Sequence, residues 1–267
     1  MNTAPIPFLN LKGINDRHRL AFREAFERVL DSGWVLLGEE TAAFERAFAA
    51  YCGVKHCVSV GNGLEALHLV LHAWGVGPGD EVIVPSHTYI ATWLAVSHTG
   101  ATPVPVEPLP GCWDMDPAQV EAAITPRTKA VLLCNPNNPT GEVRDRRTLL
   151  RLIDAHPSVC FVVDESYGAF TRQPLPTAAE MAERSNVIVI RSATKRHAVP
   201  GLRLGCLTAS AEMIDRIRVQ RMPWSVNALA VEAGKFFLQE NLPLQPPIDD
   251  LLAERDRLMA ALADLKI

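Results

Sequence analysis

The sequence predicts an α/β fold in which helices cover both faces of a mainly parallel sheet. Two observations support this prediction. Short runs rich in β-branched residues alternate with helical patterns along almost the whole chain. These runs are apolar at successive positions, which is typical of strands that lie buried between two layers of helices.

Seven of the runs are expected to be strands. The first reads His-Cys-Val-Ser-Val-Gly, and later ones contain Phe161-Val162-Val163 and Val187-Ile188-Val189-Ile190. The expected strands are 56–61, 81–85, 102–106, 129–134, 159–164, 187–191 and 204–208. Helical patterns fill the intervals between them, at 62–74, 88–98, 116–124, 145–155 and 177–184.

Helical patterns also flank the predicted sheet on both sides. Amphipathic patterns at 15–32 and 39–51 precede the first strand, and Ser32-Gly33-Trp34 links them. Further helical patterns follow the last strand at 211–221, 225–240 and 248–264, with a proline-rich break at 242–247. The chain contains no internal repeat that would indicate a repeat architecture.

Composition excludes several classes of function. Of the 267 residues, 48% are apolar and 21% are charged, as in ordinary globular proteins. The net charge is −4 and no basic run is present, so nucleic acid is not an expected partner. The N-terminus lacks the pattern of a signal peptide, and no apolar stretch reaches the ~20 residues of a membrane span. We therefore expect a cytoplasmic protein with no membrane partner.

The cysteines and histidines do not predict a metal site. The six cysteines show no Cys-x-x-Cys spacing, and Cys134, Cys160 and Cys206 each fall in an apolar run. Buried, reduced thiols are therefore expected rather than disulfides or metal ligands. His68 and His72 have helical spacing but lack a nearby acidic ligand, so zinc is not expected either.

Four segments place reactive groups near predicted strand ends. They are Asn-Pro-Asn-Asn-Pro-Thr-Gly at 135–141, Val-Asp-Glu-Ser-Tyr at 163–167, Arg-Ser-Ala-Thr-Lys at 191–195 and Pro-Gly-Leu-Arg-Leu-Gly at 200–205. Together they supply an amide, a carboxylate, an anion-binding serine and arginine, and an amine. Pyridoxal 5′-phosphate (PLP) needs these groups: an amine for the imine, donors for the phosphate, and a carboxylate that keeps the ring nitrogen protonated. The sequence therefore predicts a PLP site.

Lys195 is the predicted Schiff-base lysine. A lone lysine is most simply a solvated surface residue. Lys195, however, follows the apolar strand 187–190 and is flanked by predicted anion ligands. A lysine that lies partly desolvated among cations has a lowered pKa, which makes it a better nucleophile towards an aldehyde.

Three further residues are candidates for the cofactor ring. Asp164 closes a buried strand, where a carboxylate is costly unless it is paired, and either the ring nitrogen or a helix N-cap would pair it. Asn138, in its proline-rich turn, is expected to direct its amide to the ring's 3-oxygen, although turn chemistry alone also explains it. Tyr167 could donate to the same oxygen or serve only in packing.

The phosphate is expected to be held by Ser192, Arg203 and the backbone of the turn Gly61-Asn62-Gly63-Leu64. That turn joins a strand to a helix, so its N–H groups and the helix dipole favour an anion. Tyr89 is a candidate for stacking on the ring face, with His87 as a second candidate and a packed core aromatic as the alternative for Tyr89.

Together these residues resemble the fold-type I PLP enzymes of the aminotransferase class I/II superfamily, most clearly from about 129 to 240. The resemblance implies a three-layer α/β/α large domain. It also implies Lys195 as the Schiff-base lysine, Asp164 on the ring nitrogen, and Asn138 and Tyr167 on the 3-oxygen. Segments 187–207 and 222–230 resemble histidinol-phosphate aminotransferase and threonine-phosphate decarboxylase equally well.

The first hundred residues resemble a different branch of the same fold. Pro7-Phe8-Leu9-Asn10-Leu11, Ser32-Gly33-Trp34, the run 79–85 and the run 87–92 are similar to aminotransferases of nucleotide-linked keto-sugars. Leu64 departs from that branch, whose members carry a small hydroxylated residue after the Asn-Gly pair. The two halves therefore agree on the cofactor and differ on the substrate.

The resemblance also implies a division of the chain. Members of the superfamily continue into a small C-terminal domain, so we expect a PLP-binding large domain with N-terminal helices over 1–240. The start of a truncated small domain is expected over 241–267. The resemblance further implies a homodimer, because fold-type I sites lie where two subunits meet.

The activity expected from these features is amino transfer between an amino acid, phosphorylated or not, and a keto acid. Two alternatives remain open on the sequence. One is a PLP-dependent decarboxylase similar to threonine-phosphate decarboxylase, which would use the same cofactor contacts. The other is a non-catalytic PLP-binding fragment.

Overall fold

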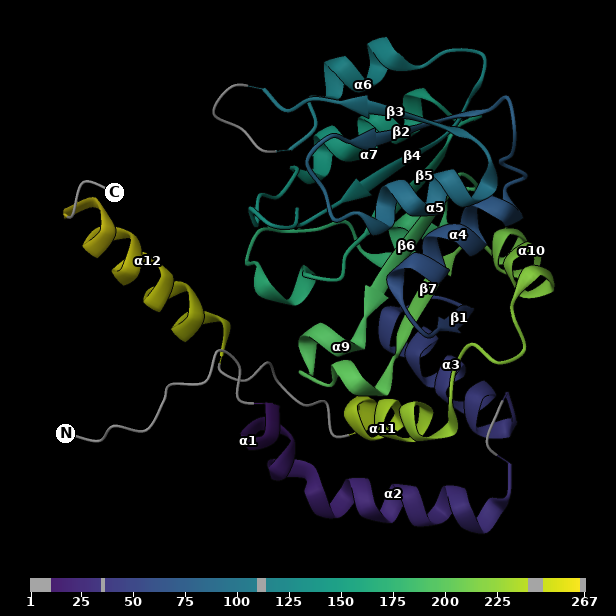
Figure 1. Cartoon of the computed structure of the whole chain (residues 1–267), viewed down its shortest axis with the longest axis vertical. Helices are drawn as coiled ribbons and strands as arrows, with labels where there is room; N and C mark the ends of the chain where they lie inside the picture. The colour runs from purple at the N-terminus through teal and green to yellow at the C-terminus, as the bar shows by residue number, and fades with distance from the viewer. Residues whose placement is uncertain (1–10, 35–36, 110–113, 240–246, 265–267) are drawn as a thin grey trace.

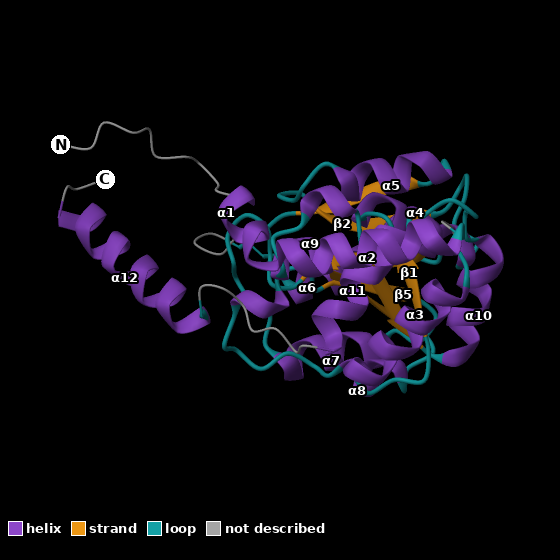
Figure 2. Cartoon of the chain, turned by 90° about the horizontal axis from the view of Figure 1, so that it is seen from below, coloured by secondary structure: helices purple, strands orange, loops and turns teal. Residues whose placement is uncertain are grey.

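The architecture was obtained as a computed structural model, which describes residues 11–34, 37–109, 114–239 and 247–264. A seven-stranded sheet lies at its centre, with helices on both faces (Figures 1 and 2). The fold is therefore the predicted three-layer α/β/α arrangement. This is the arrangement that the resemblance to fold-type I PLP enzymes implies.

The strands follow the order β1-β7-β6-β5-β4-β2-β3 across the sheet. Their bounds are β1 Cys57–Val60, β2 Glu81–Pro85, β3 Thr102–Val106, β4 Thr128–Cys134, β5 Cys160–Asp164, β6 Val187–Ser192 and β7 Gly205–Ala209. Neighbouring strands from β3 to β6 run parallel, whereas β7 is antiparallel to both β6 and β1. The sheet is thus mainly parallel, with an antiparallel edge that the sequence does not indicate.

The helices of the sheet layers lie close to the ranges expected from the sequence. They are α4 Gly63–Ala73, α5 Ala91–Thr99, α6 Pro117–Ala123, α7 Arg146–Ala155, α8 Ala178–Ala182 and α10 Ala211–Gln220. Polar side chains cap several of their first turns: Asp145 accepts from Arg147 N at 2.9 Å, and Asn62 accepts from Glu65 N at 2.9 Å. Such caps satisfy N–H groups that have no partner within the helix.

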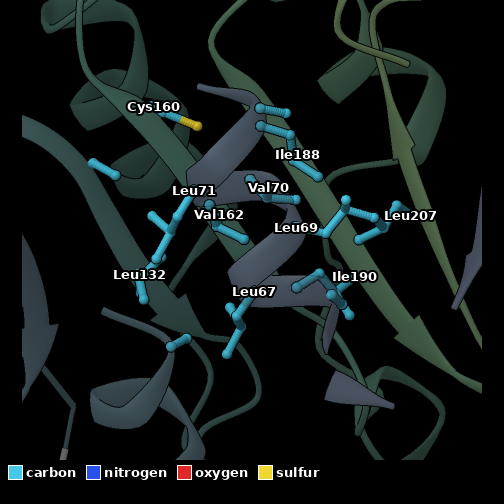
Figure 3. Packing of buried hydrophobic residues seen from close by; sticks show 14 of the residues in the cluster. Leu67, Leu69, Val70, Leu71, Leu132, Cys160, Val162, Ile188, Ile190 and Leu207 are labelled. Carbon is cyan, nitrogen blue, oxygen red and sulfur yellow. The ribbon is translucent and has the colours of Figure 1, made fainter. Parts of the chain in front are cut away.

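Each strand divides its side chains between two cores. On one face, α4, α5 and α10 pack against residues such as Val82, Val162 and Ile188. Figure 3 shows side chains of α4 among Val162 of β5, Ile188 of β6 and Leu207 of β7. On the other face, α6, α7 and α8 pack against the strand residues that alternate with these, such as Phe161 beside Val162 and Val187 beside Ile188. Because successive strand residues point to opposite faces, apolar residues at every position are what a sheet buried on both sides requires.

A third group of helices covers the antiparallel edge and carries the N-terminal segment. The predicted helix 15–32 is a 3₁₀ turn at Asp16–His18 followed by α2 Arg19–Ser32, and a short helix, α1 Leu11–Asn15, precedes it. Helices α3 Glu39–Cys52 and α11 Ala228–Gln239 contact each other, and α2 packs on α11. Phe44 of α3 lies in a small core with residues of β7 and α11.

Two elements complete the described chain. The short helix α9 Ala193–Arg196 follows β6 directly and carries the predicted Schiff-base lysine. Helix α12 Ile248–Asp264 extends away from the sheet (Figures 1 and 2). The predicted domain boundary at residue 240, most of the proline-rich segment, Pro7 to Asn10 and Cys112 all lie outside the described residues. No helix of the described chain is long and apolar enough to cross a membrane.

Candidate active site

A cavity of about 470 Å³ opens at the carboxyl ends of the parallel strands. This is the edge at which open α/β sheets bind their ligands, and the volume lies within the usual range for small-molecule sites. All ten residues predicted for the site line it. They are Asn62, Gly63, Leu64, Tyr89, Asn138, Asp164, Tyr167, Ser192, Lys195 and Arg203.

The turn between β1 and α4 forms one wall of the cavity. Asn62 caps α4 with its side chain, and Gly61 N donates to Glu65 Oε2 at 2.9 Å. Within the described residues, the backbone N–H groups of Gly63 and Leu64 make no hydrogen bond. Two N–H groups therefore remain at the N-terminal end of α4, where the helix dipole also favours an anion. The Asn62 side chain is occupied as the helix cap, so only the backbone of Asn62 is available to the phosphate, as expected from the sequence.

Ser192 and Arg203 lie on the opposite wall, where β6 ends and β7 is about to begin. Ser192 Oγ lies 2.7 Å from Thr194 Oγ1. The exposed guanidinium of Arg203 donates to the carbonyl of Pro200 at 2.8 Å. Arg203 adopts a left-handed backbone with φ of 57°, a conformation that costs free energy for a non-glycine residue and that is concentrated at functional sites.

Asp164 closes β5 at the floor of the cavity. Its Oδ1 accepts from Ser166 N at 2.8 Å. Burial raises the pKa of this carboxyl group, whereas the Ser166 hydrogen bonds and the charge of Lys195 act in the opposite direction. The carboxylate accepts a backbone N–H, as the N-cap interpretation predicts, and Asp164 also lines the cavity, as pairing with the ring nitrogen requires. A cationic ligand group beside it would offset the cost of burying its charge.

Lys195 and Tyr167 lie together at the mouth of the cavity. Lys195 Nζ is 5.7 Å from the centre of the Tyr167 ring, within the range of a cation–π contact. The lysine is exposed, and the desolvation expected from the sequence is therefore absent from this chain. The reason is that α9 lies at the surface, with the lysine on its open side.

Asn138 and Tyr89 come from the loops after β4 and β2. Asn138 is half-buried, and its backbone N–H bonds to the thiol of Cys134, whose pKa burial raises to about 12. Tyr89 is 67% exposed, so it is not the packed core aromatic of the alternative interpretation. His87, the second stacking candidate, is exposed and does not line the cavity.

The structure adds residues that the sequence reasoning missed. Thr194 and Arg191 also line the cavity. Arg191 pairs with Glu165 at 2.8 Å and donates to Cys52 Sγ at 3.2 Å. Because Glu165 follows Asp164 directly, period-two alternation sends the two carboxylates to different sides of the sheet. That alternation is the signal that predicts a separate, structural pairing for Glu165.

The set of donors fits PLP. The chain supplies an amine at Lys195, a buried carboxylate at Asp164, and anion donors from two walls at Gly63, Leu64, Ser192 and Arg203. A phosphate and a pyridinium nitrogen are the groups that would satisfy these donors and this carboxylate. By contrast, no group of three or more His, Cys, Asp or Glu in the described residues is arranged to hold a metal ion.

Comparison with known proteins gives a consistent result. Residues 17–164 match the DegT/DnrJ/EryC1/StrS aminotransferase family. The chain is 44% identical over 228 residues to a dTDP-3-amino-3,4,6-trideoxy-alpha-D-glucose transaminase of Streptomyces venezuelae, a match that covers 82% of this chain and 56% of that protein. It is 38% identical over 192 residues to an aromatic amino acid aminotransferase of Streptomyces avermitilis, covering 70% of this chain and 53% of that protein.

A solved structure supports the same relationship. The crystal structure of S. venezuelae DesV in complex with a ketimine intermediate superimposes with a TM-score of 0.70 and 35% identity, covering 89% of this chain and 67% of that one. The chain spans roughly half the length of the curated relatives it matches.

Proposed function

Because the chain belongs to the DegT/DnrJ/EryC1/StrS aminotransferase family, we propose that it carries the cofactor half of a PLP-dependent aminotransferase. The observation that carries this proposal is the single cavity in which Lys195, Asp164 and the phosphate donors meet. Those groups come from segments spread over more than half of the chain, and they have little in common except their fit to one cofactor.

The roles follow from the chemistry of each group. Bound PLP supplies an electron sink that stabilises negative charge on the substrate carbon next to the amine. Lys195 is the amine that holds the cofactor and that takes and returns the proton at that carbon. Asp164 keeps a positive charge on the ring nitrogen, and Asn138 and Tyr167 donate to the 3-oxygen. Gly63, Leu64, Ser192 and Arg203 hold the phosphate.

For the substrate, we propose a nucleotide-linked keto-sugar as the amino acceptor and an amino acid as the donor. This revises the keto acid expected from the sequence. The revision is supported by the relative from S. venezuelae, whose name describes a dTDP-sugar transaminase and which matches over a longer stretch and at higher identity than the amino acid aminotransferase. The latter match favours a second candidate, a keto acid acceptor.

The test is reduction of the purified chain with borohydride in the presence of PLP, followed by peptide mapping. A pyridoxyl adduct on Lys195 is the expected result, and exposed Lys55 is the matched control residue that should stay unlabelled. Label spread over surface lysines would refute the site. Incubation with amino acids and either a dTDP-keto-sugar or a keto acid then separates the two acceptors. Carbon dioxide release without any acceptor would instead indicate the decarboxylase, and cofactor capture without proton exchange would indicate a non-catalytic fragment.

We also propose that the chain forms a homodimer through the rim of the cavity. Two neighbouring large side chains are exposed there, Tyr89 at 67% and Ile90 at 58%. Apolar residues grouped at a functional rim are typical of an interaction surface. Sedimentation of the PLP-loaded chain should give a dimer, and Ile90→Asp should shift it to monomer. A wild-type chain that sediments as a monomer would remove this proposal.

A further inference from the structure

Arg221 lies at the end of α10, outside the cavity, and makes an unusually complete set of contacts. Its Nη1 donates to Glu45 at 2.8 Å, its Nη2 donates to Ser59 Oγ at 2.7 Å, and its Nε donates to Ser225 Oγ at 3.3 Å. The side chains of Arg221 and Glu45 are each only 11% exposed. A guanidinium fixed on three sides in this way is a rigid element of the structure.

On one side, the network is tied to β1. Glu45 Oε1 accepts from Ser59 N at 2.9 Å and from Ser59 Oγ at 2.8 Å. Ser59 is two residues before Gly61, where the phosphate-binding turn begins. Arg221 and Glu45 therefore fix the strand from which that turn departs.

On the other side, the network reaches the turn itself. The Ser225 hydroxyl bonds to the side chain of Glu65, and Glu65 Oε2 accepts from Gly61 N at 2.9 Å. The backbone of Ser225 also presses on the turn, since a Cβ at Gly61 would lie 2.5 Å from its carbonyl oxygen. Glycine at position 61 is thus a requirement of this close approach.

The electrostatics of the network support the same role. Burial raises the pKa of Glu65, and the positive charge of Arg221 opposes that rise. Arg221 therefore helps Glu65 remain a carboxylate that can accept the Gly61 N–H. The Gly61 N–H is thus directed to Glu65, while the N–H groups of Gly63 and Leu64, two residues that line the cavity, make no hydrogen bond within the described residues.

We propose that Arg221 is a positioning residue for the phosphate of the cofactor. It clamps the turn Gly61–Leu64 between β1 and Ser225, so that two backbone N–H groups stay aimed at one point. Neither Arg221 nor its partners Glu45, Ser59, Ser225 and Glu65 are among the described residues that line the cavity. The effect is therefore exerted through the turn, and the inference rests on the proposed PLP site.

The test compares PLP with pyridoxal, which has the same ring and aldehyde but lacks the phosphate. In the full chain, Arg221→Ala is expected to raise the dissociation constant for PLP about 10- to 100-fold, the range of one well-made charged hydrogen bond. The value for pyridoxal should change less than about twofold. Arg218→Ala is the matched control: Arg218 lies on the same helix, pairs with Asp215 at 3.6 Å and contacts β1 only at Cys57 O, at 3.4 Å and at the end of the strand away from the turn. Equal losses for both ligands, or no loss for PLP, would overturn the proposal.

Two further variants separate positioning from charge and from folding. Arg221→Lys keeps the charge but loses the three-way geometry, so it should restore less than half of the lost PLP affinity on a logarithmic scale. Full restoration would show a purely electrostatic role and contradict the clamp. Ser225→Ala leaves the buried Arg221–Glu45 pair intact and should still weaken PLP alone, by about 3- to 10-fold.

Hydrogen exchange keeps this inference distinguishable from the proposed function. In the chain without cofactor, the Gly61 amide should exchange at least about tenfold faster in Arg221→Ala than in wild type, because its bond to Glu65 loosens. Unchanged exchange would overturn the clamp whatever the cofactor does. A wild-type chain that shows the protected amide but binds no PLP would instead refute the proposed function.

Discussion

Residues 17–164 and residues 165–239 contribute to the same cavity in different ways. The first region contains the family match and supplies the helix N-terminus, the amide and the ring carboxylate. The second region lies beyond that match and supplies Lys195, with Ser192 and Arg203 on either side of it along the chain. The part that identifies the family is therefore separate from the part that carries the reactive amine.

The difference shows where recognition and reactivity reside in this architecture. In the first region, the residues proposed to hold the cofactor lie on loops at the ends of strands, and Ser192 and Arg203 of the second region are proposed to complete the phosphate site. The second region places its amine on a four-residue helix at the surface, where the chain is less constrained by packing. Four predictions test this division, beginning with the largest expected effect.

Removal of the amine should have the greatest consequence. Lys195→Ala is expected to lower the amino-transfer rate roughly 10⁴-fold or more, because one group serves as both nucleophile and base. PLP should still bind, held by Asp164 and by the phosphate donors of both regions, and equilibrium dialysis measures this. Loss of binding in proportion to activity would show that holding the cofactor and moving the proton are not separate tasks within the site. Lys55→Ala, on the exposed surface, is the control.

A change in the first region should have a smaller effect of a different kind. Asp164→Asn keeps the shape of the side chain and removes the charge that opposes the ring nitrogen. We expect a fall in rate of roughly 10²- to 10³-fold, as for other electrostatic groups of active sites. Borohydride should still trap PLP on Lys195. An unchanged rate would mean that Asp164 is only the helix-cap acceptor of the alternative interpretation.

Gly61→Ala tests a contact between the two regions, at which Gly61 of the first approaches the backbone of Ser225 of the second. A Cβ at this position meets the backbone of Ser225, which cannot move as a side chain would. The substitution should lower the free energy of unfolding by about 1–3 kcal/mol, as overpacking does. Gly63→Ala is the matched control, since a Cβ there meets nothing within 4 Å, and urea unfolding should give a change within about 0.5 kcal/mol. Equal effects at the two glycines would contradict the close approach.

The smallest effect concerns a cluster of rings of the second region that His18 of the first region joins, and it depends on pH. His197 stacks on Phe237 at 4.1 Å, and His18 of the first region packs against the same Phe237. Burial, assisted by the charges of Arg196 and His18, lowers the pKa of His197 to about 4 from 6.5. Between these values the unfolded chain binds a proton that the folded chain does not. Stability is therefore complete above pH 6.5 and is lost as the pH falls towards 4.

Urea unfolding at pH 7 and pH 5 measures this contribution. The wild type should lose about 1–2 kcal/mol more than His197→Phe over that interval, because the phenyl ring keeps the stack and cannot be protonated. An identical loss in both proteins would show that protonation of His197 does not cause the loss of stability at low pH.

Much of the fold could be predicted because its cause is local. The strands 81–85 and 102–106 have the expected bounds. Residues 82–85 are all buried and so appear as an apolar run, whereas 102–106 is an edge strand in which Thr102 and Pro105 are exposed. The antiparallel pairing of β7 could not be predicted, because it depends on how Gly205–Ala209 meets strands far away in sequence. The division of helix 15–32 was missed for a similar reason, as His18 turns there to join aromatic rings of α11.

The site shows the same limit. Nine of the ten predicted residues follow or close a strand, and Arg203 comes just before β7; strand ends are visible in the sequence, and the fold brings these residues to one cavity. The exposure of Lys195 was not visible, because it depends on what covers α9. The role of Arg221 could not be predicted, because its partners Glu45, Ser59 and Ser225 are dispersed along the chain and no sequence motif links them.

The strand order has a consequence for how the chain acquires its structure. The first strand, β1, lies at the sheet edge and pairs with the last, β7, so that Val60 meets Gly205. During synthesis the turn after β1 must wait until β7 has been made before its strand has a partner. Contacts this distant in sequence close late, since the intervening loop must be ordered first. A chain that stops before residue 205 would carry the family signature intact and still leave the turn without its strand partner.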